Sequence, residues 1–278
     1  TFMVADDADS AAVLRRRYDF QKANGIDVQW MTTSEMLEAE PFLSPRLVAG
    51  VYSRSDHGVD NRKVLAALRK GILDRRGKIR EHCEVREIRP HPKKPSVLTA
   101  HGDRIEGDAV VLCAGAWSKL IPGIDEAKRP PVRPVKGQMV ELRVEAPFAL
   151  RHVVRGPHAY MTPKSDGRLL VGATMEEMGF DTRVTAGGIY KILEGAWEIV
   201  PGIYDLPMLA TFAGLRPASR DNEPLLGASE APGVFYATGH YRHGIMLTPV
   251  SAQEIARLVV SGETSAWIGP FAPTRKHS

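Results

Sequence analysis

The spacing of apolar residues predicts alternating strands and helices in the first part of the chain. Residues 2–5 (FMVA) form a short apolar run and predict a strand. Residues 7–24 begin with acidic residues, carry apolar positions at helical spacing and precede a glycine, which predicts a helix. A short helix is expected over 34–42 and a strand over 47–53. Residues 61–76 carry Val, Leu and Ile at helical spacing and predict an amphipathic helix.

The next segment has the pattern of strands. Residues 79–88 predict a strand, and 97–107 predict a hairpin with a Gly-Asp turn. Residues 108–116 (DAVVLCAGA) predict a buried apolar strand that ends in glycine, with Cys113 as inert core. Since a helix and strands precede this buried strand, the order favours an α/β layer of the nucleotide-binding type.

The middle of the chain favours an antiparallel sheet, and the end returns to α/β patterning. Short strands are expected over 135–144, 158–163 and 168–175, with a hairpin turn at Lys-Ser-Asp-Gly between the last two. A helix is expected over 186–199. A strand over 234–239, a loop and a helix near 250–260 complete the pattern. The fold class is therefore α/β, with two intertwined domains.

Composition narrows the class of protein. The chain has 278 residues, of which 43% are hydrophobic and 25% charged, as in ordinary globular proteins. No apolar run approaches the roughly 18 residues of a membrane span, and we expect no transmembrane segment. Two cysteines and the absence of a basic-then-apolar leader favour a cytoplasmic protein. The net charge of +4 is scattered, and no basic run carries the interleaved aromatics of a nucleic-acid site.

The segment Gly239–Ile245 (GHYRHGI) is the strongest candidate for chemistry. Two glycines allow the backbone to approach a ligand closely, and a following helix presents free N–H groups to negative charge. An ordinary tight turn with surface His and Arg is the alternative. The sequence contains no metal-ligand spacing, no P-loop and no G-x-S-x-G motif.

Arg216 and Tyr160 are candidates for binding a carboxylate. Arg216, in the segment AGLRP, offers a bidentate guanidinium, although it could instead be a structural partner of Asp221 or Glu223. Tyr160 lies two residues from His158 in a predicted strand, hence on the same face. An aromatic core residue with a satisfied hydroxyl is the alternative for Tyr160.

Several segments together resemble a known family. They are VVLCAGAWS, RPVKGQMVEL, HAYMTPKSDGRLLVGATM, FAGLRPASRDNEPLLG and YATGHYRHGIMLTP, and their order and spacing cover residues 1 to about 260. The chain is similar to the glycine oxidase (thiazole-biosynthesis type) branch of the FAD-dependent D-amino-acid oxidase/sarcosine oxidase family. The resemblance implies an antiparallel substrate domain (1–55 and 128–213) and a Rossmann-like FAD-binding domain (56–127 and 214–278).

The resemblance also implies roles for single residues. Arg216 would clamp the substrate carboxylate, Tyr160 and Arg242 would lie beside it, and His158 and Met175 would line the pocket. The positions that would contact noncovalent FAD are Val85, Ala114, Gly115, Trp117, Gly214, Gly239, His240, Tyr241, Arg242, His243, Gly244, Ile245, Met246 and Leu247. The implied reaction is hydride transfer from glycine or a related small amine to flavin, with release of imine or keto acid and of peroxide formed from O2.

One family motif is missing from this sequence. The family begins with a strand–Gly-x-Gly-x-x-Gly–helix unit that holds the FAD pyrophosphate, and no such unit is present here. Since the first residue is Thr1, we expect the larger piece of a cleaved or two-chain enzyme, paired with an N-terminal chain that carries the motif, and an oligomer. A truncated form of a longer chain and a protein that has lost flavin binding are alternatives. For the activity, a dehydrogenase with another electron acceptor and a non-catalytic subunit are alternatives.

Overall fold

The computed structural model describes residues 1–275, which pack as two compact units. Unit 1 comprises Thr1–Val64, Gly137–Glu176 and Thr182–Gly214. Unit 2 comprises Leu65–Lys136, Glu177–Asp181 and the chain from Leu215 onward. Three of the boundaries between these units fall inside regular elements, namely one helix and two long strands. The assignment of one unit to the substrate and the other to the cofactor stays a prediction.

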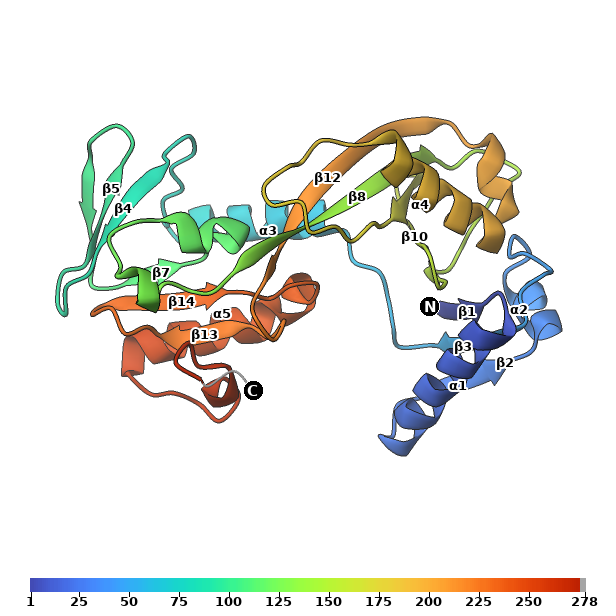
Figure 1. The fold of residues 1–278 in the computed structure, drawn as a ribbon, viewed down its shortest axis with the longest axis horizontal. Coiled ribbons are helices and arrows are strands. Elements are labelled where there is room, and N and C mark those ends of the chain that lie inside the picture. Colours follow the sequence, from blue (N-terminus) through green and yellow to red (C-terminus); the bar gives the residue numbers. More distant parts are fainter. Residues whose placement is uncertain (276–278) are drawn as a thin grey trace. The chain divides into compact units, whose positions relative to one another are not determined.

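Unit 1 is built on an eight-stranded sheet with the order β12-β8-β11-β10-β9-β1-β3-β2 (Figure 1). The strands are β1 (Phe2–Ala5), β2 (Val28–Met31), β3 (Ala49–Ser53), β8 (Arg133–Arg143), β9 (Val154–Arg155), β10 (Tyr160–Pro163), β11 (Arg168–Gly172) and β12 (Met208–Ala218). The helices are α1 (Ala8–Ala23), α2 (Thr33–Ala39) and α4 (Ala186–Ile199), followed by a 3₁₀ helix, η3 (Pro201–Asp205). A core of aliphatic and aromatic side chains lies between the sheet and α4.

Capping residues fix where the helices of unit 1 begin. Asp7 accepts the Ser10 N–H at 2.7 Å ahead of α1, and Thr32 and Glu35 form a reciprocal capping box at α2. The Thr185 hydroxyl accepts the Gly188 N–H at the start of α4. These caps account for the agreement between the predicted and observed helices of this unit.

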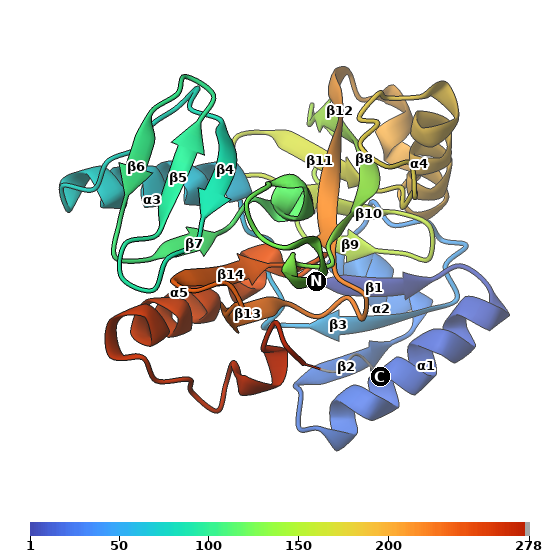
Figure 2. The same ribbon diagram turned by 60° about the vertical axis from the view of Figure 1, so that its left-hand side comes forward.

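Unit 2 contains two three-stranded sheets, with the orders β13-β14-β7 and β4-β5-β6 (Figure 2). Its strands are β4 (Val85–Arg89), β5 (Ser96–Thr99), β6 (Arg104–Glu106), β7 (Val110–Leu112), β13 (Leu225–Ala228) and β14 (Val234–Thr238). Its helices are α3 (Asn61–Asp74), which begins in unit 1, and α5 (Gly244–Ser261), with 3₁₀ helices η1 (Gly115–Leu120), η2 (Glu126–Lys128) and η4 (Gly269–Phe271). β14 and β7 are parallel, and α5 packs on β13 and β14. This arrangement confirms the α/β pattern.

Strand β7 lies at the edge of its sheet and leaves apolar side chains exposed. It pairs with β14 on one side, and Val111 is 39% exposed. Cys113, which follows β7, is also exposed. The prediction of a fully buried strand with Cys113 in the core was therefore wrong, because among the described residues the second edge of β7 has no neighbouring strand. Helix α3 likewise buries no residue, and Leu65 and Leu68 are 63% and 47% exposed.

The observed strands differ from the predicted ones in two ways: one predicted strand is shorter, and several observed strands were not predicted. Residues 79–84 are not a strand, and β4 begins only at Val85. β12 was missed because Gly214 and Pro217 favour loops, yet β12 is an edge strand, where proline is tolerated. The short strands β2, β9 and β13 were also missed.

Candidate functional site

Three segments singled out in the sequence meet in unit 2 at the carboxyl ends of β7 and β14. The Thr238 hydroxyl, at the end of β14, donates to the Gly115 carbonyl at 3.2 Å. His240 pairs with Ala218 in an isolated antiparallel bridge, and the Tyr241 N–H donates to the Pro217 carbonyl at 2.8 Å. Since ligands of α/β sheets collect at the carboxyl ends of parallel strands, this edge is the candidate site of unit 2.

The loop 239–243 is shaped to bring backbone close to a ligand. Gly239 and Tyr241 have φ of +76° and +48°, in the left-handed region. Helix α5 begins directly after this loop, at Gly244, and not near residue 250 as predicted, so residues 244–247 form its first turn. The first N–H groups of a helix have no partner within the helix, and they favour an anion or a carbonyl oxygen. The adjacent Ile245 and Met246 side chains are exposed and apolar.

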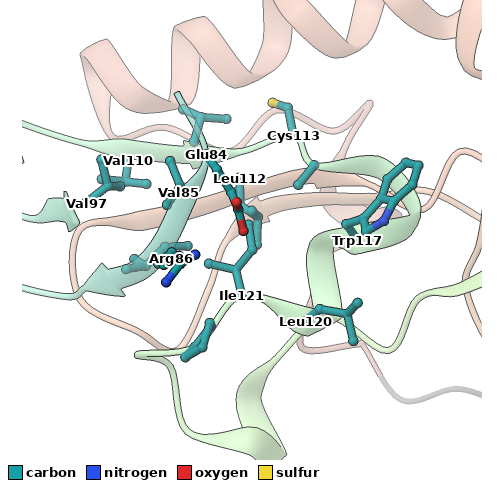
Figure 3. Close-up of a pocket in the computed structure, with 14 residues that line it drawn as sticks. Glu84, Val85, Arg86, Val97, Val110, Leu112, Cys113, Trp117, Leu120 and Ile121 are labelled. Atoms are coloured by element: carbon teal, nitrogen blue, oxygen red, sulfur yellow. The ribbon is translucent and has the colours of Figure 1, made fainter. Parts of the chain in front are cut away.

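The predicted cofactor residues Val85, Ala114 and Trp117 line one cavity of unit 2. The cavity has a volume of about 850 Å³, and Figure 3 shows Trp117 and Leu120 at one side of it and Val97 and Val110 at the other. The remaining lining residues were not predicted to contact the cofactor, because a strand's alternation does not reveal which face borders a cavity. Gly115 and Gly214 have open space where a Cβ would be. Gly115, with Ala114 and Trp117 beside it, and the first-turn N–H groups of α5 fit a flavin ring at this edge of the sheet.

Arg216 lies near the end of β12, is half-buried, and donates from Nη1 to the Lys136 carbonyl at 3.2 Å. This bond fixes the guanidinium. Asp221, one of the two acids considered as its structural partner, is bound by the Arg275 guanidinium at 2.8 and 3.0 Å. Arg242 is exposed, with its guanidinium 5.2 Å from the centre of the Tyr241 ring.

The candidates Tyr160, His158 and Met175 belong to unit 1. Tyr160 lies on β10 directly opposite Gly172 of β11, and a Cβ at Gly172 would lie 3.0 Å from the Tyr160 ring. The Tyr160 hydroxyl contacts Met139 Sδ at 3.7 Å. His158 precedes β10 and is exposed, so the prediction that it shares the strand with Tyr160 was wrong. Met175 is exposed as well.

His240 of the loop is partly shielded from water, and Ser251 of α5 is almost fully buried. Burial lowers the pKa of the His240 imidazole. Ser251 was not predicted, because a single serine within a helix carries no sequence signal.

Within residues 1–275, no three His, Cys, Asp or Glu side chains gather as metal ligands. Over the same residues, no helix combines the length and apolar character needed to cross a membrane.

These features define a class of protein. The sequence model described as FAD dependent oxidoreductase matches residues 1–258, and the chain belongs to this family. It is therefore an FAD-dependent oxidoreductase by family, as its fold indicates.

Within this family, the chain is similar to glycine oxidases and to bifunctional ThiO/ThiG proteins. The chain is 36% identical over 274 residues to a glycine oxidase of Geobacillus kaustophilus, a match that covers 98% of this chain and 72% of that protein. It is 35% identical to a bifunctional protein ThiO/ThiG of Synechocystis, with coverage of 88% and 37%. The crystal structure of glycine oxidase from Geobacillus kaustophilus superposes with a TM-score of 0.92 and 35% identity, over 100% of this chain and 75% of that one.

Proposed function

We propose that this protein oxidises glycine or a related small amino acid or amine with FAD as the electron acceptor. The observation that carries the proposal is the likeness to glycine oxidases in both sequence and fold over nearly the whole chain. The fixed guanidinium of Arg216 supports a carboxylate-bearing substrate, because a bidentate fork matches a carboxylate.

In this proposal the site residues of the chain bind and orient the substrate and the cofactor. Arg216 and the Tyr160 hydroxyl hold the carboxylate, which orients the Cα–H bond for reaction. Arg242 adds positive charge beside the carboxylate, and His158 and Met175 border the side chain of the substrate. The amides of the first turn of α5, together with Ala114, Gly115 and Trp117 beyond the end of β7, contact the flavin. Bound FAD supplies the two-electron acceptor, as cofactors generally supply the difficult chemistry.

The experiment that tests this function is a substrate screen on FAD-loaded protein. Glycine, sarcosine and D-alanine are expected to be oxidised, whereas lactate, which keeps the carboxylate but lacks the amine, is expected to be inert. Peroxide release under O2 identifies an oxidase, and turnover only with an artificial dye identifies a dehydrogenase. Failure of every amine to reduce the bound FAD contradicts the proposal.

We further propose that a second polypeptide segment, with a strand–Gly-x-Gly-x-x-Gly–helix unit, completes unit 2. The support is the edge of β7, which has no neighbouring strand among residues 1–275, together with the exposed apolar side chains of α3, since such surfaces promote aggregation unless they are covered. A parallel strand added to β7 would also place the glycine-rich turn at the carboxyl edge of the sheet.

This proposal predicts that the chain alone aggregates and that coexpression with such a segment keeps it dispersed. Val111→Lys is expected to increase the soluble fraction of the chain alone, because lysine on an edge strand opposes pairing. Val260→Lys, which adds the same charge at an exposed position of α5, serves as the control. Size-exclusion chromatography with light scattering measures the outcome. A chain that is monomeric alone and unaffected by the segment would contradict the proposal.

A further inference from the structure

The His240 side chain joins the loop 239–243 to the body of α5. Its Nε2 lies 2.9 Å from the Ser251 hydroxyl oxygen, about two turns into the helix. Ser251 is only 6% exposed, so little water competes for this hydrogen bond. A Cβ added at Gly244 would lie 3.5 Å from the Cβ of His240, so the first residue of α5 lies close to His240.

The first turn of α5 has little stabilisation of its own. Its N-cap residue, His243, makes no side-chain capping bond. Pro249 lacks an N–H, so the Ile245 carbonyl loses its usual donor four residues later. The Thr248 hydroxyl donates to the Gly244 carbonyl at 2.8 Å, so this bond does not replace the donor that the Ile245 carbonyl lacks. The start of α5 thus has a glycine, a nearby proline and no side-chain cap. Its position therefore depends on tertiary contacts.

Backbone bonds connect this turn to the residues that His240 holds. The His243 N–H donates to the His240 carbonyl at 2.9 Å, and the Leu247 N–H donates to the His243 carbonyl at 2.9 Å. A shift of His240 is therefore transmitted to His243 and from there into the helix. Burial lowers the pKa of His240 and so favours the neutral imidazole, which can share a hydrogen bond with the Ser251 hydroxyl.

We propose that His240 is a positioning residue that fixes the first turn of α5 through Ser251, and thereby aims the free amides of that turn at the cofactor. The identity of the ligand rests on the proposed function. The fixing of the turn does not, because it involves only residues of unit 2.

Hydrogen exchange of the chain purified together with the coexpressed segment that completes unit 2, without cofactor, tests the positioning role. Ser251→Ala and His240→Asn remove the bond, and the amides of Tyr241, His243 and Leu247 are expected to exchange about fivefold faster, which corresponds to roughly 1 kcal/mol for one hydrogen bond. His240→Gln reaches about as far as Nε2 and is expected to restore most of the protection. Gln253→Ala, at an exposed position of the same helix, is the matched control and is expected to leave exchange unchanged.

Titration of the same variants with FAD, followed by flavin fluorescence, tests the consequence. Affinity is expected to fall about fivefold in Ser251→Ala, to recover in His240→Gln and to be unchanged in Gln253→Ala. Unchanged exchange in both Ser251→Ala and His240→Asn overturns the positioning role, as does faster exchange with unaltered FAD affinity. If the unsubstituted protein binds no FAD, the proposed function fails, and the exchange data still decide whether His240 fixes the turn.

Discussion

Replacement of Arg216 by alanine is expected to lower kcat/KM for an amino-acid substrate by roughly 30- to 1000-fold. A charge-assisted bidentate contact with a carboxylate contributes about 2–4 kcal/mol when the partner charge is left without it. The guanidinium is fixed in the free protein by its bond to the Lys136 carbonyl, so little ordering is required when the substrate binds. Steady-state kinetics with glycine measures the effect.

Two further variants and a second substrate show whether the loss of activity comes from the contact between Arg216 and the carboxylate. Arg216→Lys keeps the charge but loses the planar fork, and it is expected to recover only part of the activity. Arg220→Ala removes an exposed arginine four residues away and is expected to change kcat/KM less than about twofold. An amine substrate that lacks a carboxylate should be equally poor for Arg216→Ala and the unsubstituted protein. An Arg216→Ala variant with an unchanged KM for glycine would exclude the clamp.

The parts of the fold that the sequence predicted are those fixed by local interactions. Helices α1 and α2 begin at side-chain caps that are visible in the sequence, and the hairpin β10–β11 turns at Lys164–Gly167. Strand β12 and the start of α5 depend on contacts with distant residues. β12 exists because it pairs along β8, and α5 begins before Pro249 because the loop 239–243 is bonded to residues 217 and 218. No local pattern encodes such contacts.

The residues of the candidate site also separate into those that local sequence revealed and those that depend on distant contacts. Gly239, in the loop 239–243, and Gly244, at the start of α5, were found because a close backbone approach demands glycine, and the observed φ of Gly239 agrees with that reason. Exposure could not be predicted for Cys113, because it depends on whether another strand covers β7. Ser251 could not be predicted either, since its importance arises only from the proximity of His240.

Glu40 provides the second large expected effect, on stability and not on activity. This residue at the end of α2 is fully buried, and its Oε2 accepts the N–H groups of Arg151 and His152 at 2.9 and 3.1 Å and lies 2.9 Å from His152 Nδ1. The His152 ring in turn packs edge-on against Phe2, at a centroid distance of 4.9 Å. One carboxylate therefore holds the segment before β9 against α2 and β1.

Glu40→Ala is expected to lower the free energy of unfolding by about 3 kcal/mol, because it leaves two backbone N–H groups without an acceptor and opens a cavity. Glu40→Gln should cost less. Its carbonyl can occupy the position of Oε2, and its amide that of Oε1, which is buried and has no partner among the described residues. Urea unfolding of the chain coexpressed with the segment that completes unit 2, followed by circular dichroism, measures both losses.

Glu38→Ala, at an exposed position of the same helix, is the control and should change stability by less than about 0.5 kcal/mol. The expected order of destabilisation is Glu40→Ala first, Glu40→Gln second and Glu38→Ala last. If Glu40→Ala proved as stable as Glu38→Ala, water would have to satisfy the N–H groups of Arg151 and His152. The segment before β9 would then be held by packing alone, through contacts such as that between the His152 ring and Phe2.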